Sequence, residues 1–237
     1  MAHFLSKEKR QLLALAFASK EKRQLLAQAH TRTRLSREST IARRDPTALV
    51  PLSFVQQRLW FLHHLDPTKG HCNTPVAVSL TGELKAEALV QTLREVVRRH
   101  DSFRTVFPLQ NGEPCQVVSQ DAEIDLSAQD LSSLAPSERE RAARAIIHQE
   151  SIRPFDVVAQ PCVRFRILCL SEKVHWLLLV PHHMVFDTWS MGVFSREMAL
   201  IYEAFREGKP SSLPDLDIQY SDFIKRSIPW LSLPRWS

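Results

Sequence analysis

The sequence predicts an α/β (α+β) sandwich in which helices flank one mixed sheet. Apolar residues alternate along 162–170, which is the period of a strand, and recur at helical spacing along 84–100 and 190–208. Strand and helix patterns interleave along the chain, which is typical of helices packed against a sheet. Asn111-Gly112 is a strong β-turn signal and adds a hairpin to this arrangement.

The first predicted elements are a strand at 75–82 and a helix at 84–100. The strand carries Val76, Val78 and Leu80 on one face. The apolar stripe of the helix is formed by Leu89, Leu93, Val96 and Val97. Two short strands, 103–107 and 115–119, then flank the hairpin turn.

The second half of the chain repeats the alternation. A helix at 136–151 precedes a strand at 162–170 and another at 174–180. The last predicted helix spans 190–208, and Gly208 ends it because glycine readily adopts the left-handed conformation of a helix terminus.

The net charge of +5 is concentrated near the N-terminal end. Residues 1–44 hold eleven Lys and Arg against three Glu, whereas residues 45–237 hold twenty basic and twenty-three acidic side chains. The main body is therefore not a basic domain, and we expect no nucleic-acid partner. Charges interrupt every long apolar run, so we also expect no membrane span, no signal peptide and a cytoplasmic location.

Residues 1–45 are predicted to form a basic helical leader and linker before a main domain at 46–237. The nonapeptide SKEKRQLLA at 6–14 recurs unchanged at 19–27, an offset of thirteen residues. Thirteen residues turn a helix by about 220°, so the two copies would face different sides of one continuous helix. Two short helices fit this repeat better. Docking of residues 1–44 to an upstream partner and a solvated linker are the two interpretations left open.

Two histidines and an aspartate follow the most apolar stretch of the chain, 177–180. A strand that needed only packing would continue with aliphatic residues, so His182, His183 and Asp187 predict a functional site. Histidine can take or give a proton near neutral pH. Neighbouring residues point in different directions, so only one histidine can face a given ligand. Asp187 is expected to cap the next helix or to pair with an arginine.

The histidine pair has two other interpretations. Adjacent histidines rarely reach one zinc ion, so we expect no metal. Histidines that are simply satisfied inside the core form the second alternative.

Four stretches of the chain resemble, in order, the motifs of one protein family. HHMVFDTWS (182–190) resembles an HHxxxDG motif, and LSFVQQRLWFL (52–62) resembles the opening motif of the same family. RRHDSFRTVF (98–107) resembles RHExLRTxF, and QYSDF (219–223) resembles YxDY. The family is the condensation domains of nonribosomal peptide synthetases, within the HHxxxD acyltransferase superfamily.

The resemblance implies the N-terminal one of two chloramphenicol-acetyltransferase-like lobes. It implies peptide-bond formation between two thioesters, each held on the phosphopantetheine arm of a carrier protein, beside adenylation domains and with no cofactor bound to the domain itself. His183 and, next to it, His182 are then the catalytic candidates, with His183 acting as general base or as a positioning group. The supporting residues on the same basis are Asp187, Arg104, Arg99 and Trp189. Asp187 is expected to pair with Arg104.

Two departures from the family pattern affect what we expect. Thr188 replaces the motif glycine, and a β-branched residue resists positive φ, so an altered loop is expected there. The chain holds only the first lobe, so we expect it to be inactive alone. A noncatalytic remnant or carrier-protein docking module, and a CoA-dependent acyltransferase, are the alternatives that stay open.

Overall fold

A four-stranded mixed sheet forms the centre of the molecule. The computed structural model describes residues 41–45, 49–120 and 122–224. In spatial order the strands are β2 (Val76–Thr81), β8 (Val174–Pro181), β7 (Val163–Ser171) and β6 (Asp125–Asp130). β8 is antiparallel to both of its neighbours, whereas β6 runs parallel to β7. The predicted mixed sheet is therefore confirmed.

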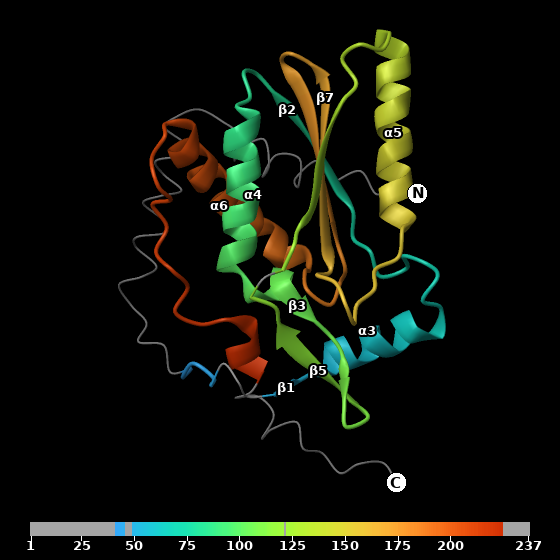
Figure 1. Ribbon diagram of the computed structural model, residues 1–237, viewed down its shortest axis with the longest axis vertical. Helices are drawn as coiled ribbons and strands as arrows, with labels where there is room; N and C mark the ends of the chain where they lie inside the picture. Colours follow the sequence, from blue (N-terminus) through green and yellow to red (C-terminus); the bar gives the residue numbers. More distant parts are fainter. Residues whose placement is uncertain (1–40, 46–48, 121, 225–237) are drawn as a thin grey trace.

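Helices cover both faces of this sheet (Figure 1). The helices are α4 (Ala86–Arg99) and α6 (Thr188–Arg206) on one face and α5 (Pro136–Ile152) on the other. Leu93 of α4 belongs to the same core as Phe165 of β7, and Ile147 of α5 belongs to the opposite core with Leu178 of β8. Both faces of β7 and β8 are thus buried, which explains why β8 is apolar along nearly its whole length.

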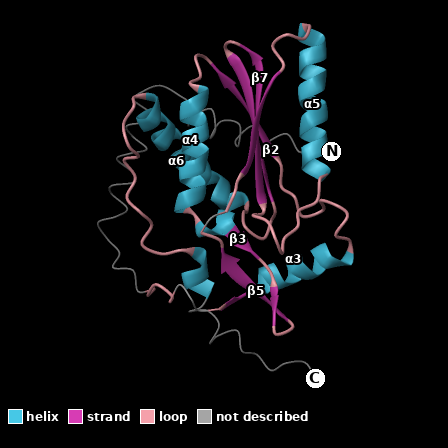
Figure 2. Cartoon of the chain, viewed as in Figure 1, coloured by secondary structure: helices cyan, strands magenta, loops and turns pink. Residues whose placement is uncertain are grey.

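A second, smaller sheet lies next to the first (Figure 2). Its strands are β1 (Val50–Pro51), β5 (Glu113–Val118), β3 (Thr105–Val106) and β4 (Leu109–Gln110). Asn111 and Gly112 join β4 to β5 with φ angles of 54° and 82°, the left-handed values that a tight hairpin turn needs. The predicted hairpin is confirmed. Helix α3 (Phe54–Leu65) starts beside this sheet, and the 3₁₀ turn η1 (Asp101–Arg104) joins α4 to β3.

Two arginines of β7 are buried beneath α5. Arg164 and Arg166 are 3% and 8% exposed. Arg166 binds Glu150 of α5 (Nη2–Oε1 2.9 Å) and Asp125 of β6 (Nη1–Oδ1 2.7 Å). Arg164 stacks on the ring of Phe155, 3.8 Å from the centroid, and burial lowers the pKa of its guanidinium to about 10. The helix therefore covers a charged network as well as apolar side chains.

The described residues include the last part of the predicted leader. Arg43 donates from Nη2 to the carbonyl of Leu216, and the amide of Arg44 donates to Asp222, both at 2.9 Å. The repeated segments 6–14 and 19–27 lie outside the described residues, so their predicted helices stay a prediction. Across the described part of the chain, no helix has the length and apolar character needed to cross a membrane.

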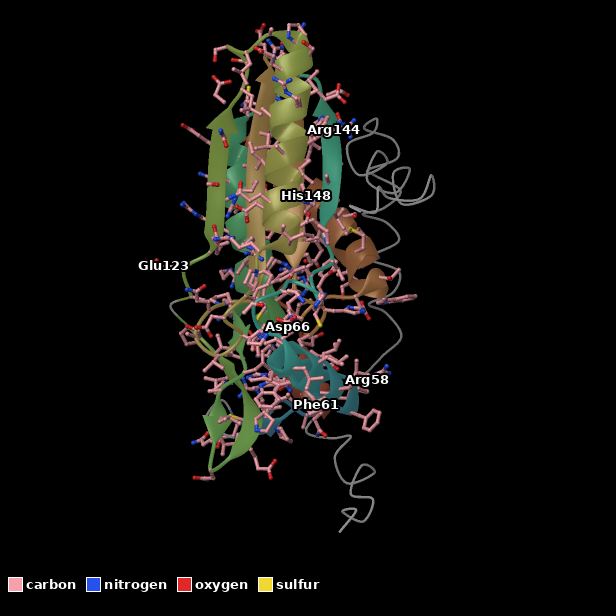
Figure 3. The ribbon with its side chains drawn as sticks, turned by 90° about the vertical axis from the view of Figure 1, so that its right-hand side faces the viewer. Arg58, Phe61, Asp66, Glu123, Arg144 and His148 are labelled. Carbon is pink, nitrogen blue, oxygen red and sulfur yellow. The ribbon has the colours of Figure 1, made fainter. Side chains whose placement is uncertain are left out.

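Glu150→Ala is expected to lower the free energy of unfolding by about 3 kcal/mol, because two buried arginines lose a shared carboxylate. Glu140→Ala on the same helix removes only an exposed ion pair with Arg144, and it is expected to cost less than about 1 kcal/mol. Arg144 and His148 mark the side of α5 that faces the viewer in Figure 3. Urea unfolding followed by circular dichroism measures both losses. Equal losses would contradict a structural role for the buried network.

Candidate active site

The loop after β8 places its two adjacent histidines in different environments. His182 continues the strand, because its amide donates to the carbonyl of Cys162 at 2.9 Å and it forms an isolated bridge with Asn73. The amide of His183 donates to the carbonyl of Cys72 at 2.8 Å. Backbone hydrogen bonds to two different segments, at Cys162 and at Cys72, therefore hold the loop before it turns toward α6.

The ring of His182 is buried and neutral. The residue is 1% exposed, and its Nδ1 accepts a hydrogen bond from the amide of Met184 at 3.2 Å, so the proton is on Nε2. The rings of His63 and Phe155 lie edge-on to it, with centroids 5.4 and 6.2 Å away. Burial, reinforced by the neighbouring His63 and His183, lowers the pKa of His182 to about 3. This environment suits a structural role and not proton transfer at neutral pH.

His183 is exposed. Its Nδ1 lies 2.9 Å from the carbonyl of Phe186, and since a carbonyl only accepts, Nδ1 carries a proton. In the neutral ring, Nε2 is then the acceptor. The two histidine rings therefore lie in different surroundings, as their adjacency predicts. Within the described ranges, no group of three His, Cys, Asp or Glu side chains is arranged to bind a metal.

Asp187 caps α6. Its Oδ1 accepts hydrogen bonds from the amide and hydroxyl of Ser190, at 2.8 and 2.7 Å. Partial burial would raise the pKa of the carboxyl group, but these hydrogen bonds lower it below its ordinary value. Of the two expected roles, helix capping is confirmed.

The expected pairing of Asp187 with Arg104 is wrong. Arg104 donates from Nη2 to Asp101 at 2.6 Å, and its other nitrogens donate to backbone carbonyls, including that of Ser119 at 3.0 Å. Asp101, three positions earlier in η1, is the acidic partner of this guanidinium, and the carboxylate of Asp187 instead caps α6.

The other two predicted supporting residues differ in burial. Arg99 is buried, and its Nε lies 3.1 Å from Glu197 Oε2, which also lies 2.9 Å from His100 Nε2. Burial alone would raise the pKa of Glu197, but His100 and Arg99 lower it to about 2. Sequence reasoning missed Glu197, although an acidic residue among the apolar positions of the last predicted helix was a signal. Trp189, in the first turn of α6, is 84% exposed.

Thr188 starts α6 without backbone strain. Among the described residues, Asn111 is the one non-glycine residue with positive φ, so Thr188 does not occupy the conformation that favours glycine. Thr188 is therefore compatible with this backbone, and the altered loop expected at this position stays a prediction.

Two glutamines in the recognised stretches hold the site together, and sequence reasoning missed both. Gln56 of α3 is 3% exposed and donates from Nε2 to the carbonyl of Met184, inside the histidine loop, at 3.1 Å. Gln219 donates to the carbonyl of Arg99 at 2.9 Å and accepts from the amide of Asp101 at 3.1 Å. A glutamine among the apolar residues of LSFVQQRLWFL was the available signal.

Comparison with known sequences identifies a family for most of the chain. A family model described as Condensation domain matches residues 47–229. The chain is 41% identical over 193 residues to chondramide synthase cmdD of Chondromyces crocatus, and 40% identical over 182 residues to a linear gramicidin synthase of Brevibacillus parabrevis. These matches cover 79% and 77% of this chain but only 5% and 2% of the two synthases.

Comparison with solved structures agrees with the family found by sequence. The X-domain from teicoplanin biosynthesis is 29% identical with a TM-score of 0.71, over 81% of this chain and 40% of that one, and the same domain has been solved in a complex with OxyB. The starter condensation domain of rhizomide synthetase RzmA has a TM-score of 0.72 at 17% identity, over 81% of this chain and 49% of that one, which shows the shared fold. This chain spans less than half of these solved chains, and the coverage fits an N-terminal lobe.

His182→Asn is expected to flatten the dependence of stability on pH. The folded-state pKa of about 3 lies below the unfolded value of about 6.5, so below pH 6.5 the unfolded chain binds a proton that the folded chain does not. Stability from this ring is complete above pH 6.5 and falls by about 2 kcal/mol by pH 5. Urea unfolding at pH 7.5, 6 and 5 measures the slope. The exposed His148→Ala variant should keep the wild-type slope, and a wild-type slope in His182→Asn would disprove the buried neutral ring.

Asp187→Ala is expected to lower the free energy of unfolding by about 1 kcal/mol, the usual cost of losing a helix N-cap. Because Asp187 and Arg104 do not pair, the losses in Asp187→Ala and Arg104→Ala should add in the double variant. A double-mutant cycle by thermal or urea unfolding measures the coupling. A coupling energy above about 1 kcal/mol would show that Asp187 and Arg104 do interact.

Proposed function

We propose that this chain, which belongs to the condensation-domain family of nonribosomal peptide synthetases, supplies the histidine-bearing lobe for peptide-bond formation between two carrier-bound thioesters. Peptide-bond formation is the function of the family. The assignment to this chain rests on its own residues, since the chain covers only a small part of the synthases that it matches.

One observation carries the proposal: exposed His183 is held by a hydrogen bond from Nδ1 to the carbonyl of Phe186. In the neutral ring this hydrogen bond leaves the lone pair on Nε2. The backbone contacts of His182 and His183 hold that ring in place. An accessible acceptor on a fixed loop is what a reaction with a nucleophilic amine requires.

The proposed step uses this lone pair directly. The amine of the downstream aminoacyl thioester attacks the carbonyl carbon of the upstream thioester. A C–N bond forms, the C–S bond breaks, the amine loses a proton and the released thiolate gains one. Nε2 of His183 either accepts the amine proton or orients the amine by a hydrogen bond, and both roles use the same nitrogen.

The other candidate residues support His183 in this proposal. His182 stays neutral and holds the loop, and Gln56 fixes the loop carbonyl at Met184. Asp187 starts α6 at the end of the loop. Arg99 joins α4 to α6 through Glu197.

The proposed partners follow from the chemistry of the substrates. Both acyl groups arrive on phosphopantetheine arms of carrier domains that adenylation domains load, so the domain needs no cofactor of its own. Residues 1–44 are the candidate docking segment for an upstream partner, and the stretch 6–27 with its repeat lies outside the described residues.

A protein-docking module is the second candidate function, and one observation favours it. The teicoplanin X-domain, 29% identical to this chain, has been solved in a complex with OxyB. A chain of this fold can therefore present a face to another protein. In this alternative the chain binds a partner, and His183 takes part in no reaction.

His183→Ala is expected to lower dipeptidyl thioester formation by at least about 100-fold, because the acceptor nitrogen of the proposed step is lost. The assay supplies donor- and acceptor-loaded carrier domains with a separately expressed second lobe, and follows product by mass spectrometry. His148→Ala, at an exposed histidine of α5, is the matched control and should keep wild-type turnover. Both variants should keep the wild-type melting temperature.

Two results would contradict the proposed enzymatic function. Wild-type turnover in His183→Ala would exclude His183 from the reaction. Carrier binding without product, while a complete condensation domain works in the same mixture, would favour the docking module.

A further inference from the structure

A small apolar pocket lies between the C-terminal end of α4 and the N-terminal end of α6. Its volume is ≈ 200 Å³, which is below the roughly 300 Å³ at which pockets for whole small-molecule ligands begin. Its walls include Val96, Phe103, Phe186, Trp189, Val193 and Phe194. We call this hollow the α4–α6 pocket.

The size of the α4–α6 pocket matches one side chain. An apolar protein cavity of about 150 Å³ is known to hold one benzene molecule. A pocket of ≈ 200 Å³ is therefore large enough for a phenyl ring or a branched aliphatic group.

The lining selects against charge. The polar residues at the wall are His100, Ser102 and Ser190, of which His100 is hydrogen-bonded to Glu197 and Ser190 to Asp187. The described residues of the lining include no Asp, Glu, Lys or Arg, so a charged guest would lose hydration without gaining an ion pair from such a side chain. The pocket therefore favours a neutral apolar group.

Phe186 connects the pocket to His183. Its carbonyl accepts the hydrogen bond from His183 Nδ1. The same residue lines the pocket, and its ring packs against those of Phe103 and Phe194, with centroids 5.8 and 6.1 Å away. One residue thus holds the imidazole by its backbone and forms the pocket wall by its side chain.

Trp189 stands at the rim of the pocket with 84% of its surface exposed. It is the most exposed of the large apolar residues in the described part of the chain. An indole at the rim of an apolar hollow can close over a guest and bury apolar area on both.

We propose that the α4–α6 pocket receives the neutral apolar side chain, aromatic or branched, of a substrate whose thioester reacts at His183. This inference rests on the proposed function and adds the class of amino acid that the site prefers. Trp189 and Val193 are then residues that determine specificity.

Binding of small thioesters to the full chain tests the pocket without turnover. The probes are the N-acetylcysteamine thioesters of phenylalanine, leucine, alanine and aspartate. Ligand-observed NMR gives the affinities, and the indole N–H resonance of Trp189, assigned with Trp189→Phe, reports the place of binding. The phenylalanyl and leucyl probes are expected to shift this resonance and to bind at least about 10-fold more tightly than the alanyl and aspartyl probes.

Three variants sharpen the test. Val193→Trp fills the pocket and should weaken phenylalanyl binding at least about 10-fold, and Trp189→Ala, at an exposed position, should weaken it several-fold. Gly192→Ala is the matched control on a neighbouring residue of α6, because an added Cβ there meets nothing within 4 Å, and it should bind like the wild type.

Equal affinity for all four probes, or wild-type binding in both pocket variants, would overturn the inference. His183→Ala separates it from the proposed function, since this variant should lose condensation and keep the preference for apolar probes. Selective binding of the apolar probes, with no condensation in any mixture, would support the pocket inference and contradict the proposed enzymatic function.

Discussion

The buried, neutral ring of His182 fixes the loop on which the candidate site depends. Its Nδ1 accepts a hydrogen bond from the amide of Met184, and its backbone amide donates to the carbonyl of Cys162. These two bonds fix the direction in which the chain leaves β8. The next residue, His183, is exposed as a result. A charged ring would have to leave these apolar surroundings, which would release the loop, so the neutrality of one histidine sets the position of the other.

The four recognised stretches act as one polar framework around this loop. The hydroxyl of Tyr220 donates to Ser53 at 3.2 Å, and Ser53 and Gln56 form a capping box that starts α3. Gln56 then reaches the carbonyl of Met184. Segments that lie far apart in the sequence are therefore linked through single side chains whose hydrogen bonds are buried or partly buried, where a lost partner is costly.

Elements with local signals could be predicted from the sequence, and elements that depend on distant partners could not. Asn111-Gly112 specifies its turn by itself, and the apolar alternation of β7 is visible in any window. β6 has little apolar character because it is an exposed edge strand, so its sequence predicts no strand. Within the site, the opposite environments of the histidines follow from their adjacency. The partner of Arg104 is Asp101, three residues earlier in the same turn, so a local signal for it was present. The partner of Arg99 is Glu197, and that pair depends on how α4 and α6 pack, which no local pattern contains.

Strand β8, one of the two inner strands of the main sheet, is the last of the described strands to be synthesised, and it pairs with one of the first. Val76 of β2 lies opposite Leu179, whereas Val163 of β7 lies opposite Pro181 in a ladder between sequence neighbours. During translation, β2 and the apolar face of α4 leave the ribosome long before their partner exists. Cys72 and Asn73, whose backbone groups bind the histidine loop, are also synthesised before their partners His183 and His182. Until β8 is synthesised, these apolar surfaces lack the strand that covers them, and exposed apolar surfaces of this kind are prone to aggregate during folding.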